Sequence, residues 1–317
     1  MRILSSFQPA LIALSVFSAI SSAAVADDDM EHLTIFGSAQ AVNDIPGSAH
    51  MLSQADLEKF DFTDIMRTLT SVPGVYVLEE DGYGLRPNIG MRGTGQNRSE
   101  KVTIMEDGIL ITPAPYSAPA AYYIPNVNRM QAVEIFKGPA AIKFGPNTVG
   151  GAINLASRPV PEDAVGELDI AYGSYNFQKL RAMYGQSFEQ FGYMIEGLRY
   201  NADGFKELDN GADTGFERND INGQLMWRSL ATAAVQQRLD VKFGYADENS
   251  DETYLGLTED DFNRNPLRRY AASAEDKFKS DHSQIHLIHQ IEFNDELSFT
   301  KALLYNSTAL AYSPFSK

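Results

Sequence analysis

The chain contains no cysteine, and this absence removes several kinds of site at once. None of its 317 residues can supply a disulfide, a thiolate metal ligand or a cysteine nucleophile. Positive charge is also scarce, since 26 lysine and arginine residues face 42 aspartate and glutamate residues, giving a formal net charge of -16. Because a nucleic-acid binder needs a basic surface, this balance argues against a nucleic-acid partner.

Long apolar runs are missing as well, apart from the N-terminus. Residues 1–26 carry Arg2, then an apolar stretch, then the small-residue triplet Ala24-Val25-Ala26 ahead of an acidic run. This pattern predicts a cleavable signal peptide, with a buried core helix as the alternative. No other segment reaches the roughly 20 apolar residues that a membrane helix needs. An exported protein of this kind can therefore enter a membrane only as a closed β-barrel.

Residues 41–160 have a compact, mixed pattern. A short helix is predicted at 63–70, ended by Pro73-Gly74, and β-rich runs follow at 75–78, 102–105 and 133–136. Loops rich in glycine, proline and asparagine separate these runs. The segment is predicted to be a small α+β domain with long exposed loops.

From residue 161 the pattern changes to strict alternation of apolar and polar residues. Leu239, Val241 and Phe243, for example, alternate with Asp240 and Lys242. Such a two-residue period, with long and short connections in turn, is typical of antiparallel transmembrane β-strands. A soluble β-sandwich would also show alternation and remains an alternative. The predicted strands are near 165–173, 177–186, 191–200, 219–230, 236–247, 280–293 and 297–306.

The polar residues do not form an enzyme site that the sequence can identify. The five histidines lack a zinc-binding spacing beside a general base, and the glycine-rich run 90–95 lacks the Lys-Ser/Thr of a phosphate loop. We therefore expect no catalytic residue, no cofactor and no metal ligand.

Five motifs in the first domain carry a family resemblance. Together, in this order and spacing, they resemble the plug domain of TonB-dependent outer-membrane receptors, most closely the ferric-dicitrate branch. They are LTSVPGV at 69–75, LRPNIGMRG at 85–93, MEDG at 105–108, VEIFKGP at 133–139 and FGPNTVGGAIN at 144–154. The resemblance implies an α+β plug domain followed by the first strands of an antiparallel transmembrane β-barrel in the outer membrane of a Gram-negative bacterium.

The resemblance also implies a partner. Residues 27–40 form a loose tail, and Leu33, Thr34, Ile35, Phe36 and Gly37 occupy the place of the TonB box. Such an extended segment can add as a strand to the sheet of TonB, which works with its inner-membrane energising complex. The alternative is that these residues are an ordinary first strand of the plug.

The ligand implied by the resemblance is a ferric chelate, with citrate or a related siderophore favoured. Haem, cobalamin, copper or nickel chelates and carbohydrates remain alternative ligands. A passive channel or an adhesin, which would share the barrel, remains an alternative function. The plug apices predicted to bind the ligand carry Arg86, Gln96, Asn97, Arg98, Tyr116 and Ser117. These could equally be ordinary solvated loop residues.

Three charged residues, Arg92, Glu134 and Lys137, lie among apolar residues of the plug. We expect them to pair with one another or with the inner wall of the barrel, because buried charges need partners. Plain fold-stabilising ion pairs would satisfy the same requirement.

The family's barrel has 22 strands, which residues 161–317 cannot supply. We therefore expect this chain to be an N-terminal fragment with an incomplete barrel. Few residues separate the predicted cleavage site from the TonB box, so no periplasmic signalling domain is expected between them.

Overall fold

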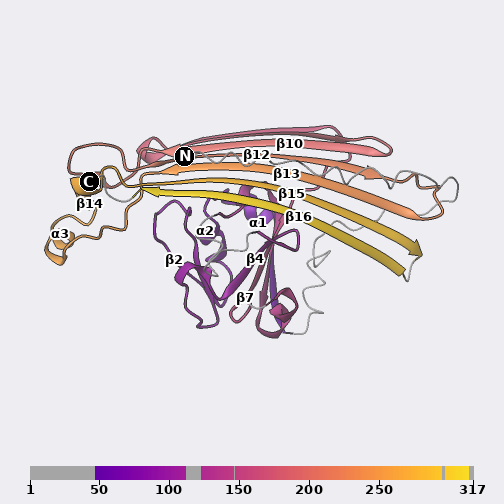
Figure 1. The fold of residues 1–317 in the computed structure, drawn as a ribbon, viewed down its shortest axis with the longest axis horizontal. Coiled ribbons are helices and arrows are strands. Elements are labelled where there is room, and N and C mark those ends of the chain that lie inside the picture. Colours follow the sequence, from indigo (N-terminus) through magenta and orange to yellow (C-terminus); the bar gives the residue numbers. More distant parts are fainter. Residues whose placement is uncertain (1–46, 112–122, 146, 295–296, 314–317) are drawn as a thin grey trace, which may run out of the picture.

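The computed structural model describes residues 47–111, 123–145, 147–294 and 297–313. The predicted signal peptide (1–26) and TonB box (33–37) lie outside these residues, as do Tyr116 and Ser117. The chain folds into a small α+β unit, the plug, covered on one side by a curved antiparallel sheet, the wall (Figure 1). In the described residues, no helix is both long and apolar enough to cross a bilayer.

The plug is built on a five-stranded sheet in the order β1-β6-β7-β4-β5. β4 and β7 pair in parallel, and the other neighbours pair antiparallel. A separate antiparallel pair, β2-β3, lies beside it. The strands are β1 (Ser48–Ser53), β2 (Val75–Leu78), β3 (Asn88–Met91), β4 (Val102–Glu106), β5 (Ile109–Leu110), β6 (Met130–Lys137) and β7 (Gly151–Ser157).

Two short helices, α1 (Gln54–Glu58) and α2 (Ile65–Leu69), begin at side-chain caps. Ser53 and Asp56 form a reciprocal capping box at α1, which satisfies backbone donors that a helix end leaves free. Asp64 caps α2, which buries its apolar residues in the plug core. Single 3-10 turns lie at Asn97–Ser99 and Val127–Arg129, and a longer 3-10 segment lies at Gly138–Phe144.

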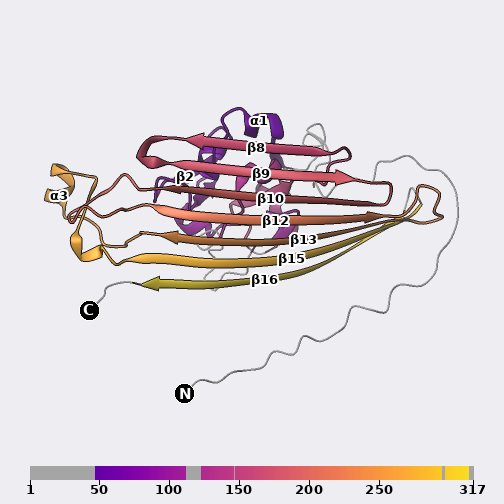
Figure 2. The same ribbon diagram turned by 90° about the horizontal axis from the view of Figure 1, so that it is seen from above.

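The wall contains seven antiparallel strands in sequential order, as the alternation predicts (Figure 2). Its later strands are longer than predicted, because neighbouring backbones keep pairing beyond the apolar stretch. The strands are β8 (Val165–Tyr172), β9 (Gln178–Ser187), β10 (Phe191–Ala202), β12 (Phe216–Arg228), β13 (Gln236–Ser250), β15 (Lys277–Asn294) and β16 (Leu297–Ser313). The connections contain the parallel pair β11 (Glu207–Leu208) and β14 (Arg268–Arg269), the helix α3 (Glu259–Arg264) and 3-10 turns at Ser174–Asn176 and Ala271–Ser273.

The polarity of the wall is inverted relative to a soluble sheet. Its exposed face carries large apolar residues such as Leu168, Ile170 and Ile285, whereas Lys179 and Arg181 are buried on the face toward the plug. A β-sandwich would bury the apolar face, so that alternative is wrong. An apolar outer face and a polar inner face are what a strand wall in a bilayer requires.

Glycine at position 151, within one of the plug motifs, is required by close packing. Its φ is +158°, and an added Cβ would meet the Met91 sulfur and the Phe136 carbonyl oxygen, each at 2.4 Å. Both neighbours belong to the buried plug core. Only a residue without a side chain fits where β6 and β7 begin to pair.

We expect Gly151→Ala to lower the free energy of unfolding of the plug by about 1–3 kcal/mol through overpacking. Urea unfolding of the full-length receptor, followed by loss of protease resistance of the plug, would measure this. Gly95→Ala is the matched control, because an added Cβ there has nothing within 4 Å. Equal unfolding midpoints for the two variants would contradict the packing argument.

Candidate functional site

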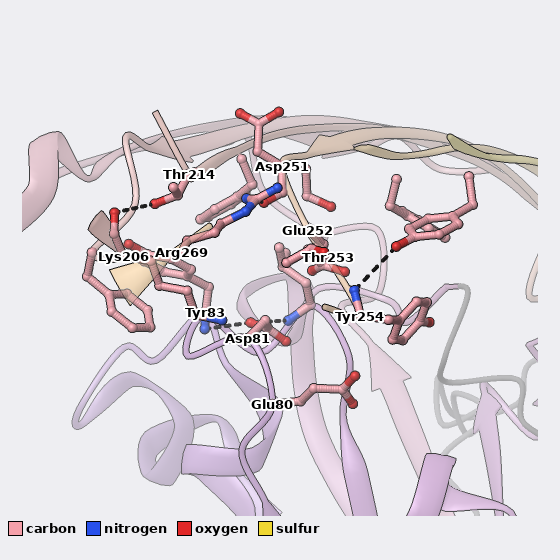
Figure 3. A pocket seen from close by; sticks show the side chains of 17 residues that line it. Glu80, Asp81, Tyr83, Lys206, Thr214, Asp251, Glu252, Thr253, Tyr254 and Arg269 are labelled. Carbon is pink, nitrogen blue, oxygen red and sulfur yellow. Dashed lines mark hydrogen bonds between the residues drawn. The ribbon is translucent and has the colours of Figure 1, made fainter. Parts of the chain in front are cut away.

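The two ends of the wall carry different connections. One end joins its strands through 188–190, 229–235 and 295–296, and the other through 173–177, 203–215 and 251–276. Because outer-membrane barrels have short periplasmic turns and longer external loops, we assign the second end to the outside of the cell. The plug segment 79–86 lies at this outer end, beside the external connections (Figure 3).

A cavity, the outer cavity, lies between plug segment 79–86 and the wall. Glu80, Asp81 and Tyr83 line it from the plug, and Glu252 and Tyr254 line it from the connection after β13 (Figure 3). The cavity is open to solvent and its volume is about 70 Å³. This is well below the roughly 300 Å³ of a typical small-molecule pocket, so it suits a single functional group of a larger ligand.

The plug side of the outer cavity is shaped by Asp81. Its carboxylate accepts hydrogen bonds from the backbone N–H groups of Tyr83 (2.6 Å), Leu85 (3.2 Å) and Arg86 (2.8 Å). These bonds hold the loop closed in the way that aspartate commonly does in turns. Asp81 is therefore used by the fold and is not a free ligand donor.

Two of the predicted ligand residues, Arg86 and Arg98, lie at this end of the molecule, each with its own partners. Arg98 donates to Glu80 at 2.8 Å and lies 5.7 Å from the centre of the Tyr254 ring. Arg86 is 4% exposed and forms a two-pronged ion pair with Glu248 of β13, at 2.6 and 3.2 Å. The donors of Arg86 thus already join the plug to the wall, and a direct contact between Arg86 and a ligand stays a prediction.

The other predicted ligand residues are described only in part. Gln96 and Asn97 belong to the same turn as Arg98, with Asn97 exposed and Gln96 half-buried. Their role in binding stays a prediction, as does that of Tyr116 and Ser117 beyond the described residues.

Two of the three predicted polar residues of the plug, Glu134 and Lys137, have partners inside it. Glu134 accepts a hydrogen bond from Asn154 at 2.7 Å, and Lys137 donates to the carbonyl oxygen of Pro73 at 2.8 Å. Arg92 is exposed. The pKa of Lys137 is lowered by the burial of its own side chain and by the positive charge of Arg92. Pairing of these three residues with the wall stays a prediction.

Besides the pair of Arg86 and Glu248, residues that the sequence did not single out make polar contacts between plug and wall. Lys242 of β13 donates to both Asp107 and Ser157 of the plug, and Lys179 of β9 forms an ion pair with Asp61. Weaker links come from neutral donors of the wall. Gln284 reaches Glu106 at 3.2 Å, Gln224 reaches the Arg158 carbonyl at 2.9 Å, and Asn306 reaches the Ile111 carbonyl at 2.7 Å.

Sequence reasoning missed these contacts, although one signal was present. Lys179 and Lys242 are charged residues at positions that alternation turns toward the interior. A charge at such a position needs a partner, and the acidic Asp107 lies in one of the plug motifs. The two residues of each pair are far apart in the chain, so the sequence could not predict which residue pairs with which.

A buried ion pair anchors this interface within the plug. Arg129 donates to both carboxylate oxygens of Glu106, at 2.6 and 2.7 Å, and both side chains are buried. Burial alone would raise the pKa of Glu106, but the Arg129 guanidinium outweighs it and lowers that pKa to about 2. Glu106 therefore stays ionised and can accept the additional bond from Gln284.

We expect Arg129→Met to destabilise the plug by about 3–5 kcal/mol, because it leaves a buried carboxylate unpaired. The double variant Glu106→Gln, Arg129→Met should recover part of this loss, since no unpaired charge remains. Urea unfolding of the full-length receptor and its two single variants completes the cycle. Additive effects of the two substitutions would show that the pair does not act as a unit.

Asp64, the cap of α2, titrates abnormally. Its side chain is buried, and burial is the main cause that raises its pKa to about 6. The nearby carboxylates of Asp81 and Glu79 add to the shift, and the hydrogen bond from the Met66 backbone N–H opposes it. The pKa in the folded chain thus lies above the ordinary value of 3.8. The folded state binds the extra proton, so stability falls as pH rises from about 4 to about 6.

Asp64→Asn keeps an oxygen for the cap and removes the titration. We expect this variant to be more stable than the native chain above pH 6, by at most about 3 kcal/mol, and similar to it near pH 4. Unfolding midpoints at both pH values would test this. A stability difference that does not change with pH would contradict it.

Comparisons with known proteins agree with this architecture. Residues 41–152 match the TonB-dependent Receptor Plug Domain family. The iron-regulated outer membrane virulence protein of Vibrio cholerae serotype O1 is 29% identical over 181 residues, covering 53% of this chain and 27% of that protein. The vitamin B12 transporter BtuB of Photobacterium profundum is 24% identical over 216 residues, covering 67% of this chain and 35% of that protein.

Solved structures share the fold. The unliganded ferric citrate transporter FecA superposes with a TM-score of 0.72 at 19% identity, over 94% of this chain and 44% of that chain. The ferric yersiniabactin uptake receptor FyuA of Yersinia pestis gives a TM-score of 0.69 at 16% identity, over 87% and 43% of the two chains. The present chain thus spans less than half of these structures and about a third or less of the two curated relatives.

Proposed function

Since this chain belongs to the TonB-dependent outer-membrane receptors, we propose that the whole protein imports a ferric chelate using energy delivered by TonB. The observation that carries the proposal is the arrangement of the plug. It lies against the inner face of a transmembrane wall, with a cavity at its outer end and breakable polar contacts along its side.

The proposed mechanism needs no covalent chemistry. A ligand enters from the outer end and contacts plug apices and external connections, where Arg98 and Tyr254 already meet. TonB pairs with residues Leu33–Gly37 and pulls them, and the force passes to the plug. The contacts of Lys242 with Asp107 and Ser157 then part, because ion pairs and hydrogen bonds can be exchanged for water once a path opens.

This mechanism assigns a role to each of four segments of the chain. We propose a signal peptide at 1–26, a tail with the TonB box at 27–40, the plug at 41–160 and the first strands of the barrel at 161–317. The outer surface of the wall contacts the lipid bilayer, in keeping with its exposed apolar residues.

Iron is favoured as the cargo because the Vibrio cholerae relative is named for its regulation by iron. Citrate is one candidate chelator. Cobalamin is the second candidate function, since the BtuB relatives are vitamin B12 transporters.

Uptake of radiolabelled iron tests the proposal. Cells carrying the complete gene would be given ferric chelates, or labelled cobalamin, with and without functional TonB. Uptake of iron that needs both the receptor and TonB supports the proposal. TonB-dependent uptake of cobalamin alone would move the assignment to that vitamin, and equal uptake without TonB would favour a passive channel.

A variant of the proposed TonB box separates binding from transport. Ile35→Pro removes a backbone donor from the strand that TonB would pair with. We expect it to abolish uptake while chelate binding at the cell surface stays unchanged, whereas Asp28→Asn in the same tail should transport normally. Normal uptake by Ile35→Pro would show that this segment is not the coupling site.

A further inference from the structure

The outer cavity contains a carboxylate, that of Glu252, which the surrounding residues pair only in part. Glu252 approaches the Arg86 guanidinium with one carboxylate oxygen, at 3.5 Å, but Arg86 already forms its closer pair with Glu248. The other oxygen, Oε1, is shielded from solvent and has no hydrogen-bond partner among the described residues. Two carboxylates therefore share one cation, and one oxygen is left for a further donor.

The cavity's buried arginine cannot serve Glu252. Arg269 is buried, and its guanidinium donates to Ser273 and to the carbonyl oxygens of Asp251 and Asp276. Lys206 also lines the cavity but is exposed to solvent. A cationic or donor group from outside would complete the pairing that the fold leaves open.

The remaining lining is aromatic. Tyr83 packs its ring 5.7 Å from that of Phe205 and 4.8 Å from that of Phe216, and Tyr254 is 73% exposed beside them. Aromatic faces attract cations, as the guanidinium of Arg98 over Tyr254 illustrates within the protein. Carboxylates and aromatic rings together select positive nitrogen groups and disfavour anionic ones.

The state of Glu252 supports the same assignment. Burial, together with the carboxylates of Glu248, Asp81 and Glu80, raises its pKa to about 7, against the opposing effect of Arg86. A positively charged ligand group would lower this pKa and release the proton. Binding of such a group should therefore strengthen as pH rises through about 7, because Glu252 becomes ionised.

We propose that the outer cavity receives a positively charged nitrogen group, an ammonium or a guanidinium, carried by the ferric chelate, and that Glu252 is its carboxylate partner. This assignment rests on the proposed function and adds the charge of the ligand to it. It selects against citrate-like chelates, whose exposed groups are anionic.

Paired probes that differ in one charge test the proposal. The complete receptor would be given ferrioxamine B, which carries a free ammonium, and N-acetylferrioxamine B, in which that ammonium is capped. Ferric citrate and a ferric tris-catecholate serve as anionic probes. We expect ferrioxamine B to bind about tenfold more tightly than its acetylated form, a ratio typical of one partly buried charge contact.

Two matched variants locate the effect. Glu252→Gln should remove most of the preference for the free ammonium, and protease resistance of the plug at the native level would show that the variant folds. Glu275→Gln, an exposed residue of the same connection outside the cavity, should keep the preference.

Equal affinity for the paired probes, tighter binding of the anionic chelates, or a preference that survives Glu252→Gln would each overturn the proposal while TonB-dependent iron uptake stands. If none of the four chelates is imported in a TonB-dependent way, the proposed function fails, and this inference fails with it.

Discussion

The structure depends on one constraint, which is that charged side chains on the inner face of the wall must find partners. A transmembrane wall has to expose its apolar face to lipid, so many of its charged residues are buried on the inner face, although Arg199 and Glu217, near the outer end, are exposed. Lys179, Arg181 and Lys242 are thereby placed where water is largely replaced by protein. The plug supplies counter-charges for Lys179 and Lys242, whereas Arg181 pairs with Glu167 and Glu196 of the wall itself. Through the two lysines, wall and plug form a single electrostatic unit.

The same constraint explains how the plug can be both fixed and releasable. Buried ion pairs contribute little net stability, because desolvation opposes the attraction, but they are costly to leave half-formed. The pair of Glu106 and Arg129 lies wholly within the plug and should keep it intact. The contacts of Lys242 and Gln284 cross to the wall and can be exchanged for water one at a time. The buried pair of Arg86 and Glu248 also crosses to the wall, so it is the costliest of these contacts to break if the plug moves as a unit.

Much of the fold could be predicted from the sequence, because it follows from local rules. The two-residue period predicted seven antiparallel strands, and the structure contains them at nearly those positions. The short helix predicted at 63–70 is α2, and the β-rich runs at 75–78, 102–105 and 133–136 are strands β2, β4 and β6. The resemblance of the five motifs to the plug domain was confirmed by the family match over residues 41–152.

The site could be predicted only in part, because it is made of long-range pairs. Arg98 was placed at an outer apex, and the structure brings it to the outer cavity. Arg86 was expected to face a ligand, yet its partner is Glu248, 162 positions further along the chain. Periodicity can say that a charge points inward, but the identity of its partner depends on how the plug is seated against the wall.

If the plug has to separate from the wall during import, a reversible cross-link between the two should block import. The chain contains no cysteine, so Asp107→Cys and Lys242→Cys introduce the only two thiols into the segment. A cleavable bifunctional thiol reagent would join them in cells carrying the complete receptor, with the unlinked double variant as reference. We expect linked receptors to bind the chelate but to import none until the linker is reduced. Unchanged uptake by fully linked receptors would contradict it.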